Sequence, residues 1–183
     1  MTHVIHTVET APEAAKEPLA AAGKSYGFVP NLLAVMADAP ALLKAYRTVI
    51  DLFDQTSLNA TERQIVLLTA SYENRCEYCV SAHSVIAKMQ KVPDAVVGAI
   101  RDGRPIADAR LEALRAFTSA IVNSRGWPSN ADTAAFLAAG YTRTQILEVV
   151  LGVGVKTLSN YTNHVAETPL DGAFAPAAWS KAA

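Results

Sequence analysis

The sequence contains only two cysteines, no long apolar run and no excess of charge of either sign. Two cysteines in 183 residues are too few for a disulfide-stabilised scaffold, and a chain of this length can bury a core without one. No apolar run approaches the roughly 18 residues needed to span a membrane. Lys and Arg number 16 against 17 Asp and Glu, so no basic surplus favours nucleic acid or an anionic membrane. We therefore expect small or weakly charged partners.

The first residues also lack the features of a secretory signal. The segment MTHVIHTVET has neither a basic flank nor an apolar stretch, so we expect a cytoplasmic protein. In a reducing compartment, a close cysteine pair is more often catalytic, redox-active or metal-binding than a structural bridge. No Gly/Ser-rich linker, charge block or low-complexity tract divides the chain, which predicts one domain over residues 1–183.

No strand-like alternation of useful length follows the first ten residues, whereas apolar residues recur at helical spacing along most of the chain. Asn59 with Glu62, and Thr142 with Gln145, have the spacing of helix-capping boxes. The predicted helices lie within residues 11–27, 31–40, 41–53, 58–74, 76–90, 92–103, 107–126, 129–140 and 142–166. The sequence thus predicts an all-α, single-domain helical bundle.

Both cysteines and one histidine fall within the stretch NRCEYCVSAHS, residues 74–84. If a helix begins near Cys76, then Cys76, Cys79 and His83 share one face, because they are spaced by three and four residues. A helix N-terminus favours a thiolate, and a histidine one turn later can take up or return a proton. A thiolate can attack a hydroperoxide and become a sulfenic acid, which a second thiol converts to a disulfide. An external dithiol must then reduce the pair.

Other uses of this motif are less favoured. A structural disulfide does not suit the expected compartment. A structural zinc site needs four ligands, and residues 76–83 supply three, although an open catalytic site with three ligands remains an alternative. A thioredoxin-type fold would require strands around its cysteine pair. We expect no metal and no cofactor.

The stretch CEYCVSAH, a C-x-x-C-x-x-x-H motif after an apolar helix, resembles the alkylhydroperoxidase D-like (AhpD-like) proteins of the carboxymuconolactone decarboxylase superfamily, most firmly over residues 58–90. The resemblance implies an AhpD-like helical bundle with Cys79 as peroxidatic cysteine, Cys76 as resolving cysteine and His83 as the motif histidine. It also implies helical homo-oligomers that are reduced by a dithiol, in the best-known branch by a lipoyl-bearing partner.

The sequence departs from this family at Gln64, where an acidic residue typically completes the proton relay. An amide does not take up a proton at working pH. Either the relay runs through Glu62 or Glu73, or the peroxidase chemistry is slower or different. Glu62 is most simply a capping residue and Glu73 a solvated residue near a helix end. His164 is a further candidate for the relay, although a lone histidine is more often an ordinary packed or surface residue.

The leading hypothesis is a thiol-dependent peroxidase that reduces hydrogen peroxide or organic hydroperoxides in antioxidant defence. The alternatives are a non-catalytic redox sensor or interaction protein and, less favoured, a lactone decarboxylase-like enzyme, which has no need of a cysteine pair. The segment ILEVVLGVGV, with Gly152 and Gly154, would allow another helix to approach closely, and its apolar character favours self-association.

Overall fold

The computed structural model describes residues 3–181, and within that range it is all-helical, with 68% helix and no strand. This confirms the predicted fold class. Residues 1–2 and 182–183 of the predicted single domain lie outside the described residues, and the one-domain assignment stays a prediction. The helices are α1 (Glu13–Tyr26), α2 (Asn31–Met36), α3 (Pro40–Asp54), α4 (Ala60–Glu73), α5 (Glu77–Met89), α6 (Asp94–Arg101), α7 (Ala109–Asn123), α8 (Asn130–Ala138), α9 (Arg143–Ala166) and the 3-10 turn η1 (Ala175–Ala177).

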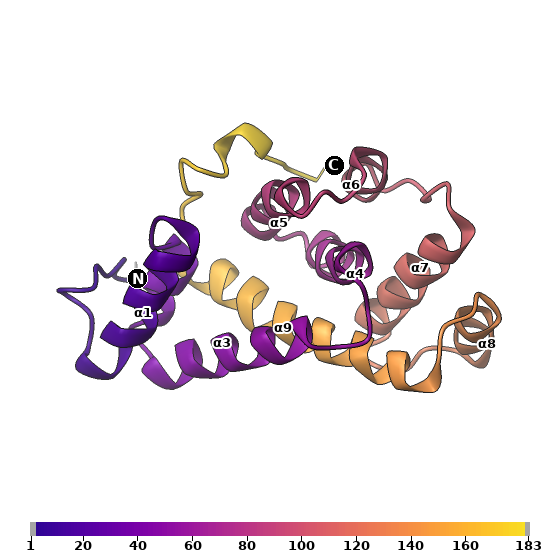
Figure 1. The fold of residues 1–183 in the computed structure, drawn as a ribbon, viewed down its shortest axis with the longest axis horizontal. Helices are drawn as coiled ribbons and strands as arrows, with labels where there is room; N and C mark the ends of the chain where they lie inside the picture. The colour runs from indigo at the N-terminus through magenta and orange to yellow at the C-terminus, as the bar shows by residue number, and fades with distance from the viewer. Residues whose placement is uncertain (1–2, 182–183) are drawn as a thin grey trace.

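Helix α4 is the centre of the bundle. It packs against α5, α6, α7 and α9, and Figure 1 shows it surrounded by these helices, with α3 and α9 running side by side along one edge. Its four consecutive residues Ile65 to Leu68 are all buried, as expected for a helix that is covered on every side. The bundle therefore holds α4 and the start of α5 in its interior.

Both predicted capping boxes are confirmed. The Asn59 side chain accepts a hydrogen bond from the backbone N–H of Glu62, whose carboxylate accepts from the N–H of Asn59, and Thr142 and Gln145 make the same reciprocal pair at the start of α9. These side chains satisfy backbone N–H groups that have no partner inside the helix. Both helices thus begin where the sequence indicates.

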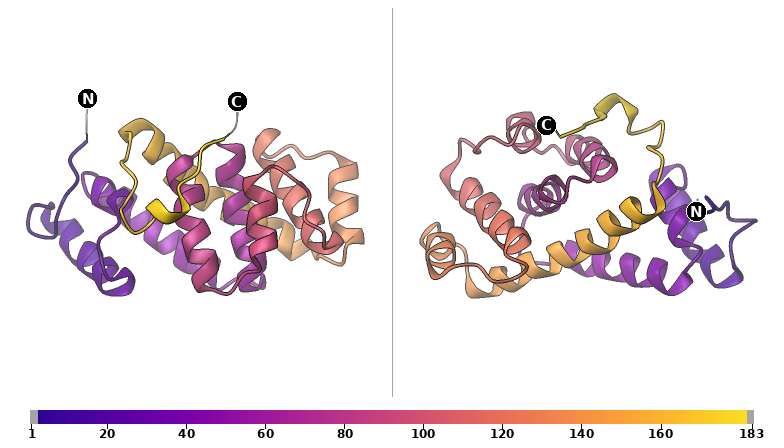
Figure 2. Two further views of the ribbon diagram at one scale, coloured as in Figure 1. Left: turned by 90° about the horizontal axis from the view of Figure 1, so that it is seen from above. Right: turned by 180° about the vertical axis from the view of Figure 1, so that it is seen from behind.

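The last described residues cross over α5, and we call residues 168–181 the C-terminal strap. Figure 2 shows it running from the end of α9 across α5 towards α6. The Tyr78 hydroxyl donates to Asp171 at 2.5 Å, and the Arg101 guanidinium donates to the carbonyls of Ala177 and Ala178. The backbone N–H of Trp179 donates to Ser81. The strap is therefore anchored at both ends to the surface of the helix that carries the cysteines.

Helix α9 leaves several apolar side chains exposed, namely Leu147, Val150, Tyr161 and Val165. They suit the predicted self-association, which stays a prediction. No helix in residues 3–181 is both long and apolar enough to cross a membrane.

Gly152 is required by the close approach of α9 to the core. A Cβ there would lie 2.6 Å from Val66 Cγ1 and 2.8 Å from the Phe53 ring. Overpacking of this kind costs about 2 kcal/mol, partly offset by the gain of about 1 kcal/mol in helix propensity. We expect Gly152→Ala to lower the free energy of unfolding by about 1 kcal/mol, measured by denaturant unfolding.

Gly154, two residues further along α9, is the matched control. A Cβ there meets nothing within 4 Å, so Gly154→Ala should stabilise the protein by up to about 1 kcal/mol. Equal effects of the two substitutions would contradict the packing at Gly152.

Candidate redox site

A tight turn between α4 and α5 places the cysteines at the start of a helix. Arg75 adopts a left-handed conformation with φ of 56°, and the backbone N–H of Cys76 donates to the carbonyl of Ser71 at 2.9 Å. Cys76 is the N-cap of α5, so that Cys79 lies in its first turn. The partial positive charge of a helix N-terminus favours an anion at this position.

The two cysteines are adjacent and reduced. Their side chains lie 3.5 Å apart, and both are free thiols. Cys76 is 1% exposed and Cys79 is 2% exposed. This proximity agrees with the prediction that they share a face of the helix. Because the side chains are already close, a disulfide between them can form with little movement of the backbone.

The polar surroundings of Cys79 come from α9. The Asn163 side-chain amide lies 3.2 Å from the Cys79 sulfur and 3.8 Å from that of Cys76, and Ser159 Oγ lies 3.8 Å from Cys79. Neither Asn163 nor Ser159 was predicted from the sequence. Their spacing of four residues on the buried face of a long helix is the only signal that could have indicated them.

The surroundings separate the acidities of the two thiols. Burial of Cys79 raises its pKa, but the hydrogen bond from Cys76 and the charge of Lys156 together lower that pKa to well below its ordinary value. For Cys76, the hydrogen bond to Cys79 and burial both raise the pKa. The surroundings therefore favour the thiolate form at Cys79 and the thiol form at Cys76.

His83 lies between two buried side chains. Its Nδ1 lies 3.0 Å from Gln64 Oε1, and its Nε2 lies 3.0 Å from the Nζ of Lys156. Gln64 Nε2 in turn donates to Gln90 Oε1 at 3.1 Å. Burial and the neighbouring Lys156 charge hold the pKa of His83 well below its ordinary value, which favours the neutral imidazole.

Lys156 is the most unexpected member of this group, because its side chain is 0% exposed. It was not predicted from the sequence. Helical spacing did indicate that this position is buried, because Lys156 lies on the same face of α9 as Val149 and Gly152. A buried lysine without a functional or electrostatic partner is rare.

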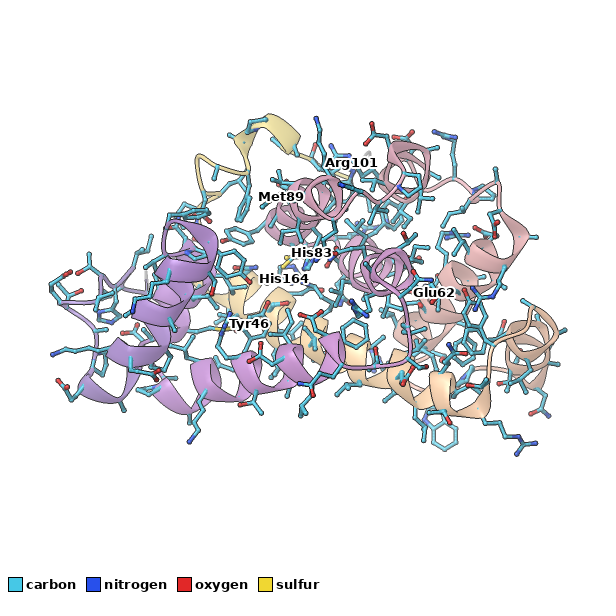
Figure 3. All side chains as sticks on the ribbon, in the orientation of Figure 1. Tyr46, Glu62, His83, Met89, Arg101 and His164 are labelled. Atoms are coloured by element: carbon cyan, nitrogen blue, oxygen red, sulfur yellow. The ribbon has the colours of Figure 1, made fainter. Side chains whose placement is uncertain are left out.

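The structure does not bring the candidate acidic residues to the cysteines. The Glu62 carboxylate closes the capping box of α4 and pairs with Arg110 of α7, and Figure 3 shows it on the side of α4 that faces α7. Glu73 accepts a hydrogen bond from Ser119, also on α7. His164 is exposed and lies beside the ring of Tyr161. Of the candidates for the relay, only Gln64 contacts His83.

A small cavity of about 50 Å³ opens beside Cys79. Cys79, His83 and Lys156 form its polar wall, and its other lining side chains are mostly apolar or aromatic. Phe174 of the C-terminal strap closes one side and packs edge-on against Tyr78 at 6.0 Å. The cavity can admit the reactive end of a small apolar molecule to the sulfur.

Among residues 3–181 there is no group of three or more His, Cys, Asp or Glu side chains arranged to hold a metal ion. Both nitrogens of His83 are already engaged, by Gln64 and Lys156. The cysteine pair and His83 therefore do not converge as three ligands.

The fold and this site define a helical protein with a buried, reduced C-x-x-C pair. Residues 37–117 match the model of the carboxymuconolactone decarboxylase family. No curated protein matches the chain.

Several solved structures have the same fold. An uncharacterised peroxidase-related protein with the AhpD core, from Ralstonia eutropha, has a TM-score of 0.83 at 20% identity, over 94% of this chain and 93% of that one. A peroxidase-related protein from Silicibacter has a TM-score of 0.78 at 18% identity, over 94% and 93%. The debrominase Bmp8, in complex with 2,3,4-tribromopyrrole, has a TM-score of 0.77 at 17% identity, over 90% and 89%.

These comparisons confirm the resemblance that the motif indicates. Residues 37–117 are similar to the carboxymuconolactone decarboxylase family, and the chain has the AhpD core fold over nearly its whole length.

Proposed function

We propose that this protein is a thiol-dependent peroxidase that reduces organic hydroperoxides and hydrogen peroxide, with Cys79 as nucleophile and Cys76 as resolving thiol. The observation that carries the proposal is the pair of free thiols 3.5 Å apart, of which one, Cys79, faces a cavity. A thiolate and a neighbouring thiol are the two groups that two-electron reduction of a peroxide requires.

The proposed reaction begins at the Cys79 thiolate. Its sulfur attacks one peroxide oxygen, so that an S–O bond forms, the O–O bond breaks and the alcohol or water leaves with one proton. The Cys76 thiol then attacks the Cys79 sulfenic acid, which forms the disulfide and releases water. An external dithiol or a lipoyl-type partner reduces the disulfide by thiol exchange and returns both thiols. His83 belongs to the buried polar chain that handles the proton.

The lining of the cavity supports organic hydroperoxides as the better substrates. Leu32, Leu33 and Ile50 contribute apolar surface beside Cys79. Binding of a substrate with an alkyl or aryl group removes apolar surface from water, which is favourable. Hydrogen peroxide has a hydrogen atom in place of that group and gains no such stabilisation. A small cavity also favours a compact substituent near the peroxide.

Dithiol-dependent turnover tests the proposal and separates an enzyme from a redox sensor. With excess small dithiol, we expect saturable consumption of an organic hydroperoxide, with a higher kcat/KM than for hydrogen peroxide. Protein whose cysteines have been alkylated is the control. A single oxidation of the pair without turnover would favour the sensor.

A brominated pyrrole is the comparison substrate, because one similar structure is a debrominase. Faster consumption of the bromopyrrole than of every hydroperoxide would contradict the assignment of substrate class. A lactone decarboxylase would convert its substrate with both cysteines alkylated.

A further inference from the structure

Lys156 is a fully buried cation that lines the cavity beside Cys79. Within residues 3–181 it forms no ion pair with a carboxylate, and its hydrogen-bond partner is His83 Nε2 at 3.0 Å. It is also the one cationic side chain in the described wall of that cavity. Burying an ammonium group is costly unless another charge compensates it. Cys79 lines the same cavity, and its thiolate form would supply that charge.

The hydrogen bonds around His83 determine which of its nitrogens carries the proton. Gln64 Nε2 donates to Gln90, so Gln64 Oε1 is the atom that faces His83 Nδ1. An acceptor at that position requires a proton on Nδ1. The other nitrogen, Nε2, then has a lone pair and accepts from the Lys156 ammonium. Lys156, and not His83, therefore has a proton to donate at the cavity.

We propose that Lys156 is a catalytic residue, which takes the proton of the Cys79 thiol and delivers it to the departing oxygen of the substrate, while His83 is a positioning residue that holds the lysine. This inference rests on the proposed peroxidase function. Gln64 fits this arrangement, because its amide oxygen fixes the imidazole tautomer without adding a negative charge that would compete for the lysine.

The proton balances over one cycle. The Cys79 thiolate forms the S–O bond as the O–O bond breaks, and the leaving alkoxide takes a proton from the Lys156 ammonium and departs as alcohol. Condensation of Cys76 with the sulfenic acid then releases water. The external dithiol reduces the disulfide to two thiols, and the neutral Lys156 amine removes the proton from Cys79. The starting ion pair is thereby restored.

Titratable groups from α1, α3, α5 and the strap surround this pair. They are Tyr26 on α1, Tyr46 on α3, Cys76, Tyr78 and His83 on or at the start of α5, and Asp171 of the strap, which accepts a hydrogen bond from the Tyr78 hydroxyl. Burial raises the pKa of Tyr46 and of Tyr78, which favours their neutral form through the pH range in which the thiolate forms. The change in thiolate absorbance with pH therefore reports on the cysteines.

Two substitutions separate the two roles of Lys156. Lys156→Arg keeps a positive charge that does not give up its proton, whereas Lys156→Met removes the charge at similar length. Thiolate formation is measured by ultraviolet absorbance against pH. We expect the thiolate at neutral pH to persist in Lys156→Arg and to be lost in Lys156→Met.

Leaving-group dependence tests the proton delivery. For Lys156→Arg we expect oxidation by an alkyl hydroperoxide to slow by about 100-fold or more, the usual size of general-acid catalysis. Oxidation by a peracid should slow far less, because its carboxylate leaves without a proton. Lys88→Met, an exposed lysine on the same helix as the cysteines, is the control and should match the wild type.

Equal slowing for both oxidants would overturn proton delivery by Lys156. An unchanged thiolate in Lys156→Met would overturn the ion pair. Failure of the wild type to consume any hydroperoxide would instead refute the proposed function. The thiolate titration needs no peroxide, so it still tests the pairing of Lys156 with Cys79 in that case. Circular dichroism on each variant establishes that it is folded before these rates are compared.

Discussion

Replacing Cys79 by serine is expected to abolish hydroperoxide consumption, because a hydroxyl does not ionise at neutral pH and does not form a sulfenic acid. Cys79 is the thiol that faces the cavity, and its sulfur has the hydrogen-bond partners that stabilise a thiolate. The rate of peroxide loss with excess dithiol measures the effect. We expect no activity above that of the dithiol alone.

Cys76→Ser is the matched control, because it removes the neighbouring sulfur and keeps a hydroxyl that can donate to Cys79. This variant should still react once per chain with a hydroperoxide and then stop at the sulfenic acid. Equal residual turnover in the two variants would contradict the assigned roles. Because the pKa of the Cys79 thiol is lowered, the first oxidation in the wild type should stay fast as the pH falls from alkaline to neutral.

Replacing His83 by leucine is expected to lower the free energy of unfolding by about 2 kcal/mol. The substitution removes the hydrogen-bond acceptor of the buried Lys156 ammonium, and a bond to a charged group is worth about 1.5–3 kcal/mol. Denaturant unfolding of the reduced protein measures the loss.

A double-mutant cycle identifies the cause of this loss. In a Lys156→Met background there is no buried ammonium to leave without a partner, so His83→Leu should cost at least about 1 kcal/mol less there. Gln64 loses its contact with the imidazole in both backgrounds, and that cost cancels in the cycle. Additive losses would mean that His83 and Lys156 do not stabilise each other.

The helices and the position of the cysteine pair were predictable from the sequence because they depend on local patterns. Apolar periodicity gave the helical elements, and the Asn59 and Thr142 caps gave the starts of α4 and α9. Cys79 and His83 lie on α5 and line the same cavity, as their spacing of four residues indicated, and Cys76 precedes them as the N-cap of that helix. Each of these features is set by residues within a few positions of one another.

The rest of the site depends on contacts between distant segments. Lys156 is 73 positions from His83, and Asn163 is 84 positions from Cys79, so no local pattern relates them. Glu62 and Glu73 were the acidic replacements for Gln64 that the sequence suggested. The structure instead pairs both glutamates with α7 and places a cation beside the histidine.

The most direct test of the central claim is to locate the first oxidised atom. Reduced Cys76→Ser protein is treated with one equivalent of an organic hydroperoxide and a sulfenic acid trap, then mapped by mass spectrometry. The account predicts one trapped adduct per chain, at Cys79. Consumption of the hydroperoxide with Cys79 unmodified would contradict it.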